Sequence, residues 1–290
     1  MKDKLKHPLH YLLLLVLVLA AKASVAQTLL RIFPQNDKPG AFVFISLLIL
    51  ALFAALAVHE LGHLLTGIFQ GFRFELFVVG PLGIKRTDKG VRIYFNKNLG
   101  FWGGVAATVP IRQNPRNKQK FAWLILAGPL ASLLFSLLSF FAFSISLSGA
   151  ARVFWLISGA ASVGIFLATT LPSKSGMFFT DRARFQRLIS KGKEGQSEEA
   201  LLSILAQTMI DTNCKHISID QTQLLQNDSD QLMRFWGYYY EFHYYKDNTL
   251  LEEAAQVRSA LLSYKGSIPS TLWKALKMDE TLATPASPNE

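Results

Sequence analysis

The sequence contains a single cysteine in 290 residues, and this scarcity excludes two kinds of site. Cys214 has no second cysteine for an intramolecular disulfide, and it lies far from any Cys/His cluster that could bind a metal. Charged residues are also few, at 17% of the chain, whereas hydrophobic residues make up 50% and include 22 phenylalanines. This composition is typical of a membrane protein.

The formal net charge of +10 does not indicate a nucleic-acid partner, because many of the basic residues flank apolar runs. Arg112, Arg116, Lys118 and Lys120, for example, directly precede one such run. Basic residues in these positions record the orientation of a chain in the membrane, with the positive side in the cytoplasm. We therefore expect the lipid bilayer to be a partner and no nucleic acid.

Residues 1–40 form the first segment, which begins with the basic stretch MKDKLKH and continues into the apolar stretch YLLLLVLVLAA. Ser24-Val25-Ala26 resembles a signal-peptidase site, so one interpretation is a cleaved signal peptide. The interpretation we favour is an uncleaved transmembrane helix from about Leu9 to Leu30. In both cases the basic end stays in the cytoplasm.

Three further apolar runs predict the core spans of a membrane helix bundle: Ala41 to Phe69, Phe121 to Leu147 and Ala151 to Leu171. Each is long enough to cross a hydrocarbon core of about 30 Å at roughly 1.5 Å per helical residue. Pro129 lies inside the second run, which membrane helices tolerate. The predicted fold is mainly α, a polytopic bundle of three core spans with an N-terminal span.

Residues 71–120 have a different character and predict a cytoplasmic β-hairpin or membrane-associated loop. The segments FRFELFVV and VRIYFN have strand-like composition and flank the turn-forming Thr87-Asp88-Lys89-Gly90. Basic residues outnumber acidic ones here, which places the segment on the cytoplasmic side.

The C-terminal part of the chain predicts a cytoplasmic helical domain over residues 191–279, followed by a disordered tail at 280–290. Together with residues 1–40 and a core at 41–190, these make up the expected organisation. The aromatic run FWGYYYEFHYY at 235–245 is expected to lie inside the helical domain. A partner surface or a nucleobase-stacking surface is the alternative.

The motif HELGH at 59–63 is the first candidate for chemistry, because it lies near the end of an apolar run. Positions four apart lie on one face of a helix, so His59 and His63 can present imidazole nitrogens to one Zn²⁺. Glu60 then lies beside the metal as a general base for hydrolysis of a peptide bond. Ionisable residues inside a spanning helix are costly and are usually retained for function.

A zinc site of this kind needs a third protein ligand, and the sequence offers few candidates. No Asp, Glu, His or Cys lies between Asp88 and Asp181, so Asp181 is the first candidate after the last core span. Glu75 and Asp88 are rivals within the predicted hairpin. The other interpretation of Asp181 is an N-cap or first-turn residue of a helix beginning at ARFQRLI.

The sequence resembles the site-2 proteases, the intramembrane zinc metalloproteases of regulated intramembrane proteolysis. The resemblance rests on HELGH at 59–63, on Ala127-Gly128-Pro129 in a later span, and on LPSKSGMFFTD at 171–181. It covers residues 41–190 and leaves the C-terminal domain outside. It implies one Zn²⁺ per chain bound by His59, His63 and Asp181, with Glu60 as catalytic base.

The resemblance also implies a membrane-protein or signal-peptide-like substrate that is cut within or near a membrane-spanning segment, towards the cytoplasmic face. A substrate helix must be unwound before cleavage, and a sheet edge can hold the extended chain. We therefore expect residues 72–97 to guide the substrate.

Two departures from the family pattern leave alternatives open. Thr169 stands three residues before Pro172, where the family usually has Asn, and Arg182 follows Asp181, where it usually has Gly. One alternative is a catalytically inactive membrane scaffold or regulatory binding protein.

Another alternative is a membrane metalloprotease with a cytosolic active site and a glutamate as third ligand. Its candidates are Glu194, Glu198 and Glu199, which in the sequence look like a solvated helix face.

Overall fold

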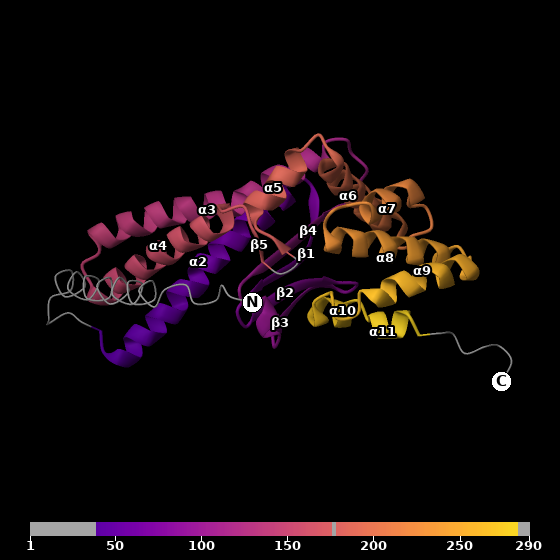
Figure 1. Cartoon of the computed structure of the whole chain (residues 1–290). Coiled ribbons are helices and arrows are strands. Elements are labelled where there is room, and N and C mark those ends of the chain that lie inside the picture. Colours follow the sequence, from indigo (N-terminus) through magenta and orange to yellow (C-terminus); the bar gives the residue numbers. More distant parts are fainter. Residues whose placement is uncertain (1–38, 176–177, 284–290) are drawn as a thin grey trace, which may run out of the picture.

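The computed structural model describes residues 39–175 and 178–283, which form a long helix bundle with a small sheet and a helical domain at one end (Figure 1). The predicted N-terminal span lies outside the described residues, as does the last part of the predicted tail. Among the described residues, three helices are long and apolar enough to cross a membrane.

The three long helices match the predicted core spans: α2 (Ala41–Phe69), α3 (Asn117–Ile145) and α4 (Gly149–Thr170). All three pack against one another. Many of their large apolar side chains are exposed, as expected for surfaces that face lipid. Helix α3 continues through Pro129, as predicted.

An antiparallel sheet follows α2 and has the strand order β3-β2-β1-β4. Its strands are β1 (Phe72–Val79), β2 (Leu82–Thr87), β3 (Gly90–Phe95) and β4 (Val105–Pro110), with the short 3-10 helix η2 (Leu99–Phe101) before β4. The predicted hairpin was therefore incomplete.

The error has a clear origin in local sequence. The turn at Thr87 to Gly90 joins VRIYFN to β2, not to FRFELFVV, which lies in the sheet interior between β2 and β4. The segment LGIKRT of β2 alternates weakly, and VAATVP of β4 is short and ends in proline, so neither gives a strong strand signal.

The sheet is attached to α2 by apolar contacts. Phe77 and Val79 of β1 form a buried cluster with Leu64 of α2, and Phe53 packs against it. At Gly80, which has φ +55°, an added Cβ would overlap the Phe53 ring, so the turn after β1 lies directly against the helix. The strands are therefore held beside the part of α2 that carries HELGH.

A short segment connects the bundle to the helical domain. It contains the two-residue strands β5 (Lys174–Ser175) and β6 (Phe178–Phe179), which pair with each other, and the helix α5 (Asp181–Ile189). Helix α5 packs against α3, α4 and α6.

The C-terminal domain consists of helices, as predicted. They are α6 (Lys193–Asp211), α7 (Ile219–Gln226), α8 (Gln231–Asp247), α9 (Leu251–Ser263), α10 (Ser270–Ala275) and α11 (Met278–Thr281). The domain extends into the predicted tail, because α11 runs to Thr281 and Leu282 is buried.

The aromatic run lies in α8, and much of it faces the interior of the domain, as predicted. Phe235 is fully buried, and Tyr240 and Phe242 are buried as well. Cys214 is also buried in this core, and burial raises the pKa of its thiol to about 12. The thiol is therefore a packing group and not a nucleophile.

We predict that Phe235→Ala lowers the free energy of unfolding of the C-terminal domain by about 3–5 kcal/mol, because it empties a fully buried aromatic position. Denaturation of the full chain in detergent, followed by near-ultraviolet circular dichroism, measures this change. Leu251→Ala is the matched control, since Leu251 is 64% exposed. Its effect should stay within about 0.5 kcal/mol, and equal losses for the two variants would contradict the packing described.

Candidate metal centre

Helix α2 carries His59, Glu60 and His63 on its buried side. Their exposed fractions are 5%, 8% and 8%, in a helix that otherwise presents much apolar surface. The two imidazole rings are one helical turn apart, with centroids 4.8 Å from each other in an edge-to-face arrangement. Helical spacing therefore brings the two rings together as predicted.

Helix α3 orients both rings through the nitrogens that face away from the cluster. His63 Nδ1 lies 2.9 Å from the carbonyl oxygen of Leu124, and His59 Nδ1 lies 2.9 Å from Ser132 Oγ. A carbonyl oxygen can only accept, so His63 Nδ1 is the donor and His63 Nε2 keeps its lone pair. This is the tautomer that a metal-binding histidine requires.

The position of His63 also explains the Ala127-Gly128-Pro129 sequence. A Cβ added at Gly128 would overlap the imidazole of His63, and one added at Gly62 would overlap the backbone carbonyl of Ala127. These two glycines allow α2 and α3 to approach closely where the imidazoles lie. The sequence analysis used this motif only as part of a family resemblance and did not reveal that its glycine leaves room for the imidazole of His63.

Asp181 is the first residue of α5, and its carboxylate reaches the two histidines. Its Oδ2 lies 3.3 Å from His59 Nε2 and 3.5 Å from His63 Nε2. Thr180 occupies the N-cap position, so Asp181 is a first-turn residue of α5, and its carboxylate also lies beside the two histidines.

The three donor atoms have the spacing that a tetrahedral metal requires. His59 Nε2 and His63 Nε2 are 3.3 Å apart, close to their distances from Asp181 Oδ2. Bonds of about 2.0–2.1 Å to a tetrahedral Zn²⁺ place ligand atoms about 3.3–3.4 Å apart. Within the described residues, His59, His63 and Asp181 are the one group of at least three such side chains that could hold an ion.

Glu60 stands beside the three donors without belonging to their set. Its carboxylate is packed against Gly104, where an added Cβ would lie 2.5 Å from Glu60 Oε1. Gly104 has φ +103°, a conformation that favours glycine. The backbone of Ala106, in β4, also lies next to the Glu60 carboxylate. The start of β4 therefore forms one wall of the site.

The rival ligands lie elsewhere and are engaged in other contacts. Glu75 pairs with Arg73 at 2.6 Å, and Asp88 is exposed in the β2–β3 turn. Glu198 pairs with Arg187 at 2.9 Å, and Glu199 pairs with Lys118 at 2.8 Å. The prediction of a solvated face was wrong for Glu198, whose side chain is fully buried.

The residues that depart from the family pattern occupy positions outside the donor cluster. The hydroxyl of Thr169 donates to the carbonyl oxygen of Ile165 within α4. Arg182 is exposed on α5, although its neighbour Asp181 joins the histidines. The unusual sequence around Asp181 therefore leaves the three donor atoms together.

Comparison with known proteins gives one match. The model of peptidase family M50 matches residues 47–282, which includes the sheet, the candidate metal centre and most of the C-terminal domain. This match is wider than the resemblance seen in the sequence, which ended at residue 190. No curated protein and no solved structure matches the chain.

We predict that the protein purified in detergent contains about one Zn²⁺ per chain, because the spacing of the three donor atoms fits a tetrahedral ion. Metal analysis should show loss of the ion in His59→Ala and in Asp181→Ala. Glu75→Ala serves as the control, since Glu75 pairs with Arg73 away from the cluster. Full zinc content in Asp181→Ala would exclude Asp181 as a ligand.

Proposed function

Because the chain belongs to peptidase family M50, the site-2 protease family, we propose that it is an intramembrane zinc endopeptidase. It would hydrolyse peptide bonds in or near transmembrane segments of membrane proteins or of signal-peptide-like remnants. The observation that carries this proposal is the meeting of His59, His63 and Asp181 at distances that suit zinc, within a bundle of apolar helices.

His59, His63 and Asp181 would hold the metal, and their chemistry suits it. Two neutral imidazoles and one carboxylate form the three-ligand set of catalytic zinc sites, which leaves a fourth position open. A zinc ion held by these residues would supply Lewis-acid chemistry and would lower the pKa of a bound water to about 7. The neighbouring carboxylate then performs the proton transfers.

Glu60 is the proposed general base. It accepts a proton from the attacking water and returns it to the leaving amine, which is a common division of roles in such sites. Its packing against Gly104 and its contact with the Ala106 backbone fix the carboxylate between the helix and the sheet. A base held in this way has little freedom to leave the site.

The orientation follows from the charges around the site. Lys118 and Lys120 lie in the first turn of α3, and Arg112 and Arg116 precede it. The start of α3 is at the same end of the bundle as the sheet and the C-terminal end of α2 (Figure 1). The positive-inside rule puts this end in the cytoplasm. We therefore place the active site towards the cytoplasmic face and the C-terminal domain in the cytoplasm.

The sheet offers a way to hold an unwound substrate. In the order β3-β2-β1-β4, no other strand among the described residues pairs with the outer edge of β4. Since Ala106 of β4 contacts Glu60, an extended peptide on that edge would run past the base. We accordingly assign substrate guidance to β4, which the expected segment 72–97 does not contain.

The inactive-scaffold alternative rests on the Asp181-Arg182 sequence. The exposed side chain of Arg182 and the intact donor cluster favour the active enzyme over this alternative. A glutamate ligand is disfavoured as well, because Glu198 and Glu199 are held by ion pairs to other residues.

We predict that Glu60→Gln abolishes cleavage of a co-expressed membrane substrate and leaves zinc content unchanged. Loss of a general base lowers the rate by about 10²–10⁴-fold, and glutamine retains the shape of the side chain. Immunoblotting of the substrate and metal analysis of the purified enzyme give the two readouts. Glu199→Gln, at a side chain 57% exposed, is the control. Cleavage at the wild-type rate in Glu60→Gln would refute the mechanism.

We predict that single proline substitutions from Val105 to Val109 in β4 lower cleavage at alternate positions. Proline removes an amide donor, so positions whose amide points away from β1 should lower cleavage by at least about tenfold. Zinc content should stay at the wild-type level in those variants. The same scan over β3, the opposite edge strand, is the control. Unchanged cleavage with outward-facing prolines in β4 would refute substrate guidance by this strand.

A further inference from the structure

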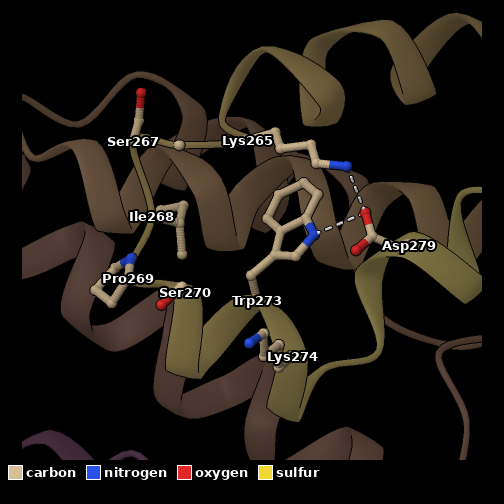
Figure 2. A pocket seen from close by; sticks show the side chains of 9 residues that line it. Lys265, Ser267, Ile268, Pro269, Ser270, Trp273, Lys274 and Asp279 are labelled. Atoms are coloured by element: carbon tan, nitrogen blue, oxygen red, sulfur yellow. Dashed lines mark hydrogen bonds and ion pairs between the residues drawn. The ribbon is translucent and has the colours of Figure 1, made fainter. Parts of the chain in front are cut away.

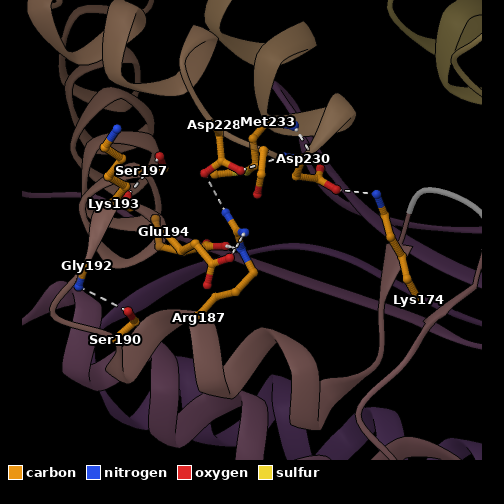
Figure 3. Close-up of polar contacts among 12 residues, drawn as sticks. Lys174, Arg187, Ser190, Gly192, Lys193, Glu194, Ser197, Asp228, Asp230 and Met233 are labelled. Carbon is orange, nitrogen blue, oxygen red and sulfur yellow. Dashed lines mark hydrogen bonds and ion pairs between the residues drawn. The ribbon is translucent and has the colours of Figure 1, made fainter.

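The loop between α7 and α8 in the C-terminal domain contacts the segment that carries Asp181 at two points. Figure 3 shows Asp228 facing Arg187 of α5, and Asp230 facing Lys174 of β5. Lys174 lies before Asp181 in the chain and Arg187 lies after it. The loop therefore binds this segment both before and after Asp181, the proposed ligand.

The first contact is a buried ion-pair network centred on Arg187. The guanidinium donates from Nη2 to Asp228 Oδ2 at 2.7 Å and from Nε to Glu198 Oε1 at 2.9 Å. Arg184, one turn earlier on α5, pairs with the other oxygen of Glu198 at 2.8 Å. Arg187, Glu198 and Asp228 are all at most 5% exposed, so solvent screens this network little.

The second contact joins Lys174 to Asp230 and reaches Phe179, which lies two residues before Asp181. Lys174 Nζ forms an ion pair with Asp230 Oδ2 and lies 5.3 Å from the centroid of the Phe179 ring. The guanidinium of Arg187 lies 4.9 Å from the same centroid. Phe179 is thus attracted by two cations, each of which is bound to one carboxylate of the loop.

The loop that supplies these carboxylates is itself held in place. Asp228 Oδ1 accepts from the amide of Asp230, and Asp230 Oδ1 accepts from the amides of Leu232 and Met233 at the start of α8. Asp230 is therefore the N-cap of α8 and a partner of Lys174 at once. The position of Asp228 and Asp230 is set by the helical domain, not by the segment they contact.

A metal ligand on α5 needs such support. The helix has nine residues and no side-chain hydrogen bond at its N-cap, and an isolated helix of that length is unstable in water. A donor atom must nevertheless stay within about 0.2 Å of its proper metal distance. Contacts with other elements must therefore fix where Asp181 lies.

We propose that the Asp228–Asp230 loop positions Asp181 for metal binding through Arg187 and Lys174. This inference rests on the proposed role of Asp181 as a ligand. It makes the C-terminal domain a structural part of the metal centre, and it defines Asp228, Asp230, Arg187 and Lys174 as positioning residues.

The test measures zinc affinity by chelator competition on the full-length protein in detergent, with the wild type and Asp181→Ala as references. Lys174→Gln should weaken zinc binding about tenfold, and Asp228→Asn about 10–100-fold, the range found for groups that support metal ligands. Arg187→Lys keeps the charge and should retain part of the affinity. Cleavage by Lys174→Gln should recover with excess zinc, whereas Glu60→Gln should not recover.

The matched control is Asp279→Asn in the same domain. Figure 2 shows Asp279 of α11 bound by Lys265 and by the indole nitrogen of Trp273, and α10 and α11 lie away from α5 in Figure 1. Its side chain is 65% exposed, and the variant should bind zinc as the wild type does. Circular dichroism and the unfolding midpoint of each variant identify any loss of fold.

Each result separates this inference from the proposed function. Wild-type zinc affinity in folded Lys174→Gln and Asp228→Asn, with loss of zinc in Asp181→Ala, would overturn the positioning role alone. Retention of zinc in Asp181→Ala would overturn the ligand role as well. If Asp228→Asn does not fold, Lys174→Gln decides, because Lys174 is 36% exposed and its removal leaves the N-cap of α8 intact.

Discussion

The close approach of α2 to α3 at the imidazole of His63 is the contact on which the rest of the site depends. Gly62 and Gly128 permit it, and through it the carbonyl of Leu124 and the hydroxyl of Ser132 hold both imidazoles by Nδ1. The free Nε2 atoms then face the same point. Without this contact, the two imidazole rings would be buried in an apolar bundle without hydrogen-bond partners and without a fixed orientation.

Two elements outside the α2–α3 contact, β4 and α5, complete the site. The histidines stand on a helix of 29 residues, the base is held between that helix and the first residues of β4, and the carboxylate comes from a helix of nine residues. Asp181 therefore stands on a much shorter helix than the histidines do. The ion pairs of Arg187 and Lys174 hold this short helix and the segment before it.

Local patterns in the sequence predicted the features that need only local information. Apolar runs identified α2, α3 and α4, and helical spacing put His59 and His63 together. The absence of other acidic or histidine side chains before Asp181 also singled out that residue. In contrast, β2 and β4 were missed because their polar and apolar residues alternate only weakly. Their pairing with β1 is what identifies them as strands. The burial of Glu198 was missed because its partner Arg187 lies on another helix, and no periodicity within α6 reports that contact.

The missed features share a physical cause, and it bears on how the site works. Both β4 and the Arg187 network are defined by contacts between segments distant in the chain, and each forms one side of the candidate centre. Since the C-terminal domain holds α5, a change in the docking of this domain would move Asp181 relative to the two histidines. The arrangement thus links the candidate metal centre to the C-terminal domain through two pairs of buried or half-buried charges.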